Sequence, residues 1–124
     1  MEENLKQLLL KDLCARSLYG LICSIYRIDD CNVGWRDEKL TGYFMIGTEY
    51  EFYFGESPIS IDNIFKIKPY LRPLSSMTEE ERKYFRKLAF PYDFVDALNK
   101  HHFDYRNLIE KGLALEAPED MYKK

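Results

Sequence analysis

Two histidines and an aspartate that lie close together in the chain are the residues best suited to chemistry: His101, His102 and Asp104. Imidazole nitrogens and carboxylate oxygens ligate metal ions and act as general acids and bases. Adjacent residues of a helix, however, point about 100° apart, so His101 and His102 are poorly placed to hold one ion. The pair also lacks the i, i+4 spacing of an HExxH helix. We therefore expect this polar cluster to be structural, with the His102 ring hydrogen-bonded, and we predict no bound metal.

Motifs for nucleophilic catalysis and for nucleotide binding are absent from the sequence. The chain has no GxSxG element, and its glycines form neither a phosphate-binding loop nor a dinucleotide fingerprint. Ser75 and Ser76 precede an expected helix, where serines commonly serve as turn or capping residues. The sequence thus predicts no catalytic residue and no cofactor. A small enzyme with an unrecognised site is kept as one alternative function.

Basic residues gather in one stretch, residues 66–87, although the net charge of the chain is −3. We predict that an interaction surface, if this stretch forms one, uses the following side chains: Lys66, Lys68, Tyr70, Arg72, Arg82, Lys83 and Arg86. Basic side chains next to aromatic ones can bind single-stranded nucleic acid. The negative net charge and the glutamates at 79–81 disfavour that function. A solvated helix face beside an acidic tail explains the same pattern.

The composition is that of one soluble globular domain. The 124 residues suffice for a hydrophobic core, and 46% apolar and 31% charged residues are ordinary values. Three cysteines without a CxxC pair disfavour a disulfide scaffold or a zinc ribbon and fit a reducing compartment. The charged amino-terminal stretch differs from a signal peptide, and no apolar run approaches the ~20 residues of a membrane span. We expect a cytoplasmic protein with no membrane segment.

The positioning element of the chain is a proline-containing segment, residues 68–77. Pro69 and Pro73 fix φ and lack N–H donors, and each favours extended backbone in the residue before it. These properties disfavour a helix or a central strand. We predict an extended strap outside the core that links a strand-rich half to a helical half.

Three side chains of this strap have defined expected environments. Leu71 and Leu74 should face inward, and Arg72 should remain at least partly solvated. After the strap, Thr78 fits an N-cap and Glu81, three residues on, completes a capping box. A helix should therefore begin here.

The first half of the chain predicts one helix followed by a small antiparallel sheet or partial barrel. Leucines at i, i+3, i+4 and i+8 indicate an amphipathic helix over 3–16, capped by Glu3 or Asn4. A turn is expected at 29–32. Strands are expected at 21–28, from Gly34 onward, at 40–46, at 50–54 and around Ile59 and Ile61.

The second half predicts two or three helices. The first, from Thr78, should bury Phe85, Leu88 and Ala89 and stop before Pro91. The second should run to about His101 with these residues inward: Phe94, Val95 and Leu98. A third, capped by Asp104, should end at Gly112, with residues 113–115 docked as an extended segment and residues 119–124 frayed. The fold class is α+β, as a single domain over 1–124 with strand-rich (1–67), strap (68–77) and helical (78–124) parts.

Three stretches carry a resemblance to known proteins: LLLKDLCARSLYGLIC (8–23), IKPYLRPLSSMTEEE (67–81) and LNKHHFDYRNLIEKGLALEAPEDMY (98–122). In these the chain resembles a group of small proteins from phages and integrated mobile elements of gut Bacteroides-type bacteria, whereas residues 24–60 match no pattern of that group. The resemblance implies a cytoplasmic accessory protein of a mobile element in a bacterial host. It implies no activity and no catalytic residue.

These observations favour a non-catalytic protein-interaction or accessory module with a protein partner. Single-stranded nucleic-acid binding is the first alternative, and a steep fall of affinity with salt distinguishes it. An enzyme is the second, and metal analysis of the purified protein tests the version that uses His101 and His102.

Overall fold

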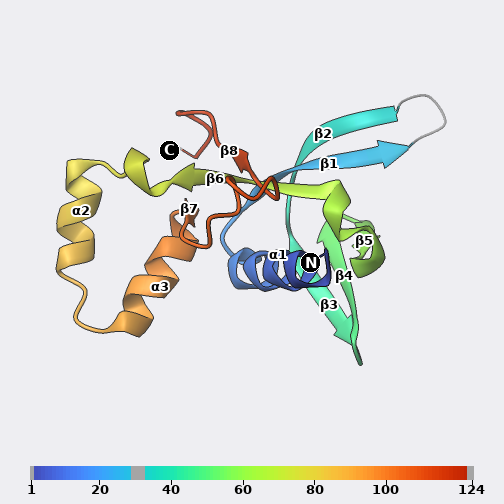
Figure 1. Ribbon diagram of the computed structural model, residues 1–124, viewed down its shortest axis with the longest axis horizontal. Coiled ribbons are helices and arrows are strands. Elements are labelled where there is room, and N and C mark those ends of the chain that lie inside the picture. The colour runs from blue at the N-terminus through green and yellow to red at the C-terminus, as the bar shows by residue number, and fades with distance from the viewer. Residues whose placement is uncertain (1, 29–32, 123–124) are drawn as a thin grey trace.

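The computed structural model describes residues 2–28 and 33–122 and has the α+β fold that the sequence predicts. Helix α1 (Glu2–Arg16) and two sheets form the larger part of the molecule, while α2 (Glu79–Arg86) and α3 (Pro91–Lys100) lie together at one end (Figure 1). The strands are β1 (Ile22–Ile28), β2 (Val33–Lys39), β3 (Gly42–Ile46), β4 (Glu49–Phe54), β5 (Ser57–Ser60), β6 (Ile67–Pro73), β7 (Phe103–Asp104) and β8 (Leu115–Glu116). Two 3-10 helices, η1 (Ile61–Lys66) and η2 (Leu74–Ser76), flank β6.

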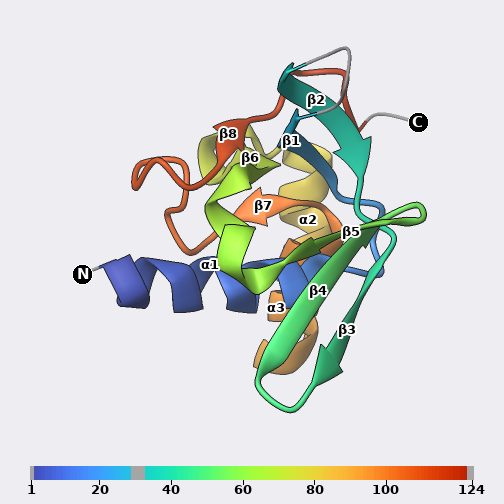
Figure 2. The same ribbon diagram turned by 90° about the vertical axis from the view of Figure 1, so that its right-hand side faces the viewer.

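The strands form two sheets instead of one. The first has the order β2-β1-β6-β7, with β8 also paired to β6, and the second is the antiparallel sheet β3-β4-β5. The β3–β4 hairpin lies on the side of α1 remote from α2 and α3 (Figure 1), and its tip projects beyond α1 (Figure 2). The hairpin expected from 40–46 and 50–54 is confirmed, whereas Ile61 begins η1 and is not in a strand. The turn expected at 29–32 lies outside the described residues.

Helix α1 packs on the main core through the apolar stripe that the sequence predicts. Leu9 and Leu13 are fully buried, and Leu5 and Leu8 are partly buried against the same cluster. The helix already includes Glu2, so the expected caps Glu3 and Asn4 lie inside its first turn. The core continues through both sheets, including Ile25 of β1, Phe52 of β4, and Ile67 and Leu71 of β6.

The expected strap is in fact the strand β6, which pairs with β1, β7 and β8. Successive N–H groups of a strand point to alternate edges. The Arg72 N–H donates to the His102 carbonyl at 2.7 Å, so the nitrogens of Pro69 and Pro73, an odd number of positions away, face the other edge. Among the strands of the described residues, only β8 meets that edge, at Tyr70 and Leu71. Both prolines therefore occupy positions where no N–H is required.

Of the two leucines of this segment that were expected to face inward, Leu71 and Leu74, only one does so. Leu71 is fully buried, but Leu74 is exposed. Leu74 begins the 3-10 helix η2, after β6 has ended at Pro73, so the strand alternation that buries Leu71 no longer fixes the direction of its side chain. Arg72 is partly solvated, as predicted.

Helices α2 and α3 begin where the sequence predicts, but fewer of their apolar side chains are buried than predicted. The Thr78 hydroxyl accepts the Glu81 N–H at 3.2 Å, and the Glu81 carboxylate accepts the Thr78 N–H at 2.9 Å, which confirms the capping box. Phe85 and Leu98 are buried together with Phe103 in a second apolar cluster. Three residues expected to face inward lie outside it: Ala89, Phe94 and Val95 are exposed.

The carboxy-terminal segment contains a turn where a third helix was expected. The Asp104 carboxylate accepts the N–H groups of Leu108 and Ile109 at 2.9 and 3.0 Å, as a capping residue does, but the chain between Asp104 and Gly112 closes only a turn. Residues 115–116 then dock on β6 as β8, which confirms an extended segment here. The expectation of fraying is wrong for Tyr122, which is packed against the body.

Candidate functional site

The predicted interaction residues do not form one surface. Lys66, Lys68 and Tyr70 lie in η1 and the first part of β6, whereas Arg82, Lys83 and Arg86 lie on α2 at the opposite end of the molecule (Figure 1). Arg72 lies between the two groups. The stretch 66–87 therefore supplies two separate candidate surfaces and a connecting arginine.

The first surface is the outer face of the sheet β2-β1-β6. Trp35 is 48% exposed, its ring lies 5.5 Å from that of Tyr26 in an edge-to-face arrangement, and the Lys68 Nζ lies 5.4 Å from the Trp35 centroid. The Tyr70 hydroxyl donates to Asp37 at 2.8 Å. Burial and this hydrogen bond raise the pKa of Tyr70. Aromatic rings and one ammonium group thus share an open sheet face.

Arg72 connects β6 to the start of α2. Its Nη1 and Nη2 each donate to Glu81 at 2.7 Å, and Nη2 also donates to the Ser76 carbonyl at 3.3 Å. The guanidinium carbon lies 4.2 Å from the centroid of the Phe103 ring. The hydrogen bonds from Arg72, aided by the Thr78 N–H, lower the pKa of Glu81 to about 2. Arg72 therefore acts as a structural connector and differs from an ordinary surface cation.

The histidine cluster is placed for packing. His101 makes edge-to-face contacts with Tyr84 and Phe85, and the buried His102 stacks on Tyr122 with ring centroids 3.8 Å apart. Burial, reinforced by the charge of Arg16, lowers the pKa of His102 to about 4. Its Nδ1 has no hydrogen-bond partner among the described residues, so the expected hydrogen bond is not met at that atom.

Metal ligation finds no geometric support in the described part of the chain. Residues 2–28 and 33–122 contain no group of three or more His, Cys, Asp or Glu side chains arranged to hold an ion. The carboxylate of Asp104 is already engaged by two backbone N–H groups. Burial raises the pKa of Cys14 to about 11 and that of Cys23 well above its usual value, so neither thiol ionises near neutral pH.

A buried charge network under α1 was missed by the sequence analysis. Asp12 and Arg16 are fully buried; the Arg16 Nε lies 3.0 Å from each carboxylate oxygen of Asp12, and its Nη2 donates to the Phe103 carbonyl at 2.6 Å. Arg106 also donates to Asp12, at 2.7 Å. The signal in the sequence is spacing: Leu9, Asp12 and Arg16 lie at i, i+3 and i+7 on the apolar stripe itself.

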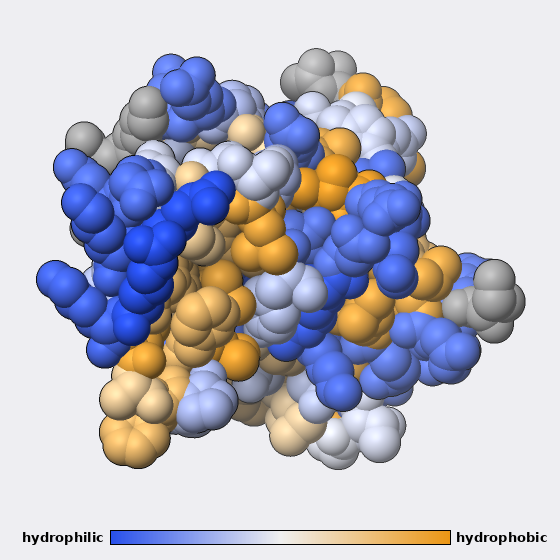
Figure 3. Space-filling model, turned by 60° about the vertical axis from the view of Figure 1, so that its left-hand side comes forward, coloured by the Kyte–Doolittle hydropathy of each residue, from blue (hydrophilic) through white to orange (hydrophobic). Residues whose placement is uncertain are grey.

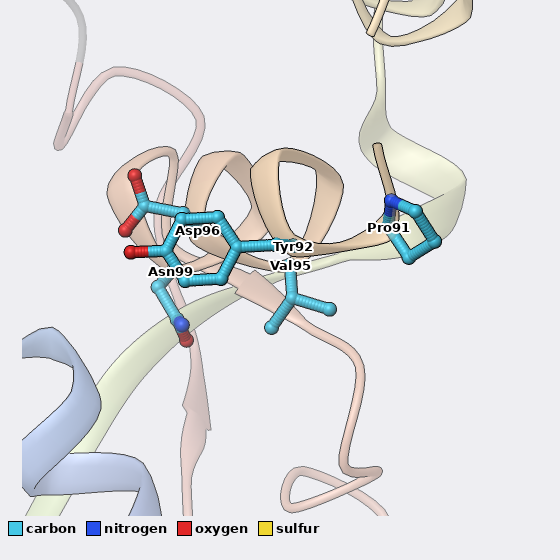
Figure 4. Close-up of a pocket in the computed structure, with 5 residues that line it drawn as sticks. All are labelled: Pro91, Tyr92, Val95, Asp96 and Asn99. Carbon is cyan, nitrogen blue, oxygen red and sulfur yellow. The ribbon is translucent and has the colours of Figure 1, made fainter. Parts of the chain in front are cut away.

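A further candidate surface, outside the stretch 66–87, is the exposed side of α3. Tyr92, Val95, Asp96 and Asn99 lie at i, i+3, i+4 and i+7 and, with Pro91, line a shallow cavity of about 420 Å³ (Figure 4). Tyr92 is 80% exposed and Val95 is 44% exposed. The Tyr19 hydroxyl donates to Asp96 at 2.6 Å and the Tyr105 hydroxyl to Asn99 at 2.9 Å, so the polar end of this stripe is fixed to the body.

Hydrophobic side chains are prominent at this end of the molecule. With the α2–α3 end brought forward, a band of hydrophobic surface runs between hydrophilic regions (Figure 3). Tyr84 and Phe90 are also exposed here, and the exposed Leu18, which follows α1 in the chain, lines a pocket with Lys100 and His101. Most of the first two turns of α3 is thus available for contact.

Comparisons of the chain with protein-family models, with curated protein sequences and with solved structures find no match. In the part of the chain that the structure describes, no helix is both long and apolar enough to cross a membrane.

Proposed function

We propose that the protein is a non-catalytic interaction module that binds a partner protein through α3. The observation that carries this proposal is the unequal burial of the helix. Its last turn is anchored by Ala97 and Leu98, whereas Tyr92 and Val95 form an apolar stripe that faces outward. An outward apolar stripe with helical spacing is the surface that packs against another helix.

The carboxylate of Asp96, on the stripe itself, accepts from Tyr19 of the same chain, and the basic side chains of the neighbouring α2 favour a partner whose contact helix has acidic flanks. Residues 82–87, which comprise the later part of α2 and its C-cap Lys87, carry four exposed basic side chains and no acidic one: Arg82, Lys83, Arg86 and Lys87. The two helices are joined directly by residues 88–90. Opposite charges at the rim of an apolar contact increase the association rate and select the partner.

The biological setting is part of the same proposal. The resemblance of 8–23, 67–81 and 98–122 to small proteins of phages and mobile elements supports an accessory role in the cytoplasm of a bacterial host. The partner is then a host protein or another protein of the element.

A pair of synthetic helical peptides tests the contact chemistry. Both carry the same apolar face, one flanked by Glu and the other by Lys, and fluorescence anisotropy measures their binding. We expect tighter binding of the Glu-flanked peptide, with the difference shrinking as salt rises. The variant Tyr92→Lys/Val95→Lys should lose this binding, while Trp35→Ala, on the sheet face, should retain it. Equal binding of both peptides, or unchanged binding by the α3 variant, contradicts the proposal.

Capture from the host identifies the physiological partner. Proteins retained by the parent chain and by Trp35→Ala, but not by Tyr92→Lys/Val95→Lys, are identified by mass spectrometry. Binding is then repeated with the purified partner. A partner that binds the α3 variant as well as the parent places the interface elsewhere.

One observation favours a second candidate, single-stranded nucleic-acid binding. The open sheet face combines Tyr26, Trp35 and Lys68, and aromatic rings beside a cation can stack an unpaired base. Trp35 is the single tryptophan of the chain, so its fluorescence reports on that face directly. Titration with an oligo-dT strand should quench the Trp35 fluorescence at low salt. High salt should dissociate the strand and restore the fluorescence. Unquenched fluorescence at low salt removes this candidate.

A further inference from the structure

Strand β3 is an open edge of the second sheet. In the order β3-β4-β5 it pairs with β4 on one side, and no strand among the described residues covers its other side. Its last four residues are apolar and between 43% and 65% exposed: Tyr43, Phe44, Met45 and Ile46. The strand contains no charged residue and no proline. Charged residues and proline, two of the features by which exposed edges avoid pairing, are therefore absent from β3.

We propose that β3 pairs with β3 of a second copy of this chain, so that the two three-stranded sheets join into one. In an antiparallel pair related by a two-fold axis perpendicular to the sheet, each copy keeps the same face up. Phe44 and Ile46 then meet their counterparts on one face, and Tyr43 and Met45 meet theirs on the other. Every cross-strand contact at the centre is between apolar side chains.

The charge distribution identifies a second copy as the occupant. Recognition of a different protein commonly uses complementary charges, and β3 offers none. Self-pairing needs no such complement, because an uncharged strand meets an uncharged strand. The nearest acidic residues are Glu49 and Glu51 on β4. In the joined sheet the two β4 strands are three strand spacings apart, about 14 Å, which exceeds the screening length of ~8 Å at physiological salt.

The shape of the hairpin permits this contact. The β3–β4 hairpin lies on the side of α1 remote from the α2–α3 end (Figure 1), and its tip projects beyond α1 (Figure 2), so two copies can approach edge to edge without the α3 surface taking part. This dimer is independent of the proposed partner surface on α3.

Sedimentation velocity of the full chain over a wide concentration range tests the proposal. We expect a monomer–dimer equilibrium. Phe44→Lys and Met45→Lys each introduce a charge at the centre of the paired strands and should raise the dimer dissociation constant about tenfold or more. The matched control Tyr92→Lys adds the same charge to the exposed side of α3 and should leave the dissociation constant unchanged. Far-UV circular dichroism confirms that each variant is folded.

Hydrogen exchange provides a second readout that does not rely on the variants. The amides of residues 43–46 should gain protection as concentration rises through the dissociation constant, while those of α3 should not change. A chain that stays monomeric at all concentrations overturns the proposal. So does a dimer that persists in Phe44→Lys, or one that protects α3 and leaves β3 unprotected.

Discussion

Arg72 and Glu81 form a two-pronged ion pair, with both nitrogen–oxygen distances at 2.7 Å, that fastens β6 to the first turn of α2. The Glu81 carboxylate also completes the capping box with Thr78. One carboxylate therefore positions a strand, a helix start and, through Arg72, the Phe103 ring. The helical end of the molecule depends on this connection because the apolar cluster beneath it is small.

Replacing Arg72 by Ala should destabilise the fold by ~1–3 kcal/mol, the usual range for hydrogen bonds to charged groups. This exceeds the value for an ordinary surface charge, which is about 0.5 kcal/mol. Urea titration measures the change, and the double variant Arg72→Ala/Glu81→Gln should cost less than the sum of the single changes. Simple additivity of the two changes contradicts a coupled pair.

Acid should remove the contribution of Glu81 to the stability of the fold. Its pKa in the folded protein, about 2, lies below the ordinary value of 4.5, so ionised Glu81 stabilises the fold above pH 4.5. That stabilisation is lost as the pH falls through the interval from 4.5 to about 2. The stability difference between the parent and Glu81→Gln should shrink over this interval. A constant difference from pH 6 to pH 2.5 excludes the linkage.

His102 should make the fold sensitive to mild acid. Burial lowers its pKa from 6.5 to about 4, so the unfolded chain binds a proton more readily between these values, and stability falls as the pH drops from 6.5 towards 4. The loss between pH 7 and pH 5 should be roughly 1–2 kcal/mol. His102→Asn should abolish this dependence; Asn suits the positive φ of 65° at this position. If the stability of His102→Asn falls with pH as steeply as that of the parent, another group causes the acid sensitivity.

The buried charges under α1 should be intolerant of single changes. Asp12→Asn leaves Arg16 buried without a counter-charge and should destabilise the protein by about 3–5 kcal/mol. A joint replacement, Asp12→Leu/Arg16→Met, should be much milder because no fully buried charge remains; Arg106, which also loses Asp12, is partly solvated. Thermal and urea unfolding of the two variants checks this order. A double variant as unstable as Asp12→Asn shows that packing, not charge, dominates.

Leu71 and Leu74 provide a matched pair within one segment. Leu71→Ala removes a fully buried side chain and should cost about 2–5 kcal/mol. Leu74→Ala changes an exposed side chain and should stay within about 0.5 kcal/mol. Comparable losses in urea titration show that Leu74 is covered in solution.

The sequence predicts correctly those elements that are determined by residues close together in the chain. The Thr78–Glu81 capping box, the amphipathic α1 and the β3–β4 hairpin all follow from spacing within a few residues. The strap was mistaken because the role of Pro69 depends on which edge its nitrogen faces, and this is set by a pairing with β1 more than forty residues away.

The sequence predicts the candidate surfaces only in part. The apolar residues of α3 were recognised, but their periodicity does not say whether another element covers them, and Phe94 and Val95 are exposed. The basic stretch 66–87 was recognised as well, yet the turn at η2 sends its two halves to opposite ends of the molecule. Asp12 and Arg16 have the spacing of an exposed helical ion pair, and only the distant Phe103 and Arg106 make that pair suitable for burial.

The charge network under α1 also imposes an order on biosynthesis. Arg16 bonds a carbonyl 87 residues later in the chain, and Asp12 accepts from an arginine 94 residues later. At ~5–20 residues per second, a ribosome needs about 4–17 s to make the first of these intervals. During that time Arg16 and Asp12 lack the Phe103 carbonyl and the Arg106 guanidinium that they bond in the folded protein. Helix α1 therefore cannot complete its packing on the core. The helix thus leaves the ribosome well before the residues that it bonds, and until they arrive its leucines are open to chaperones.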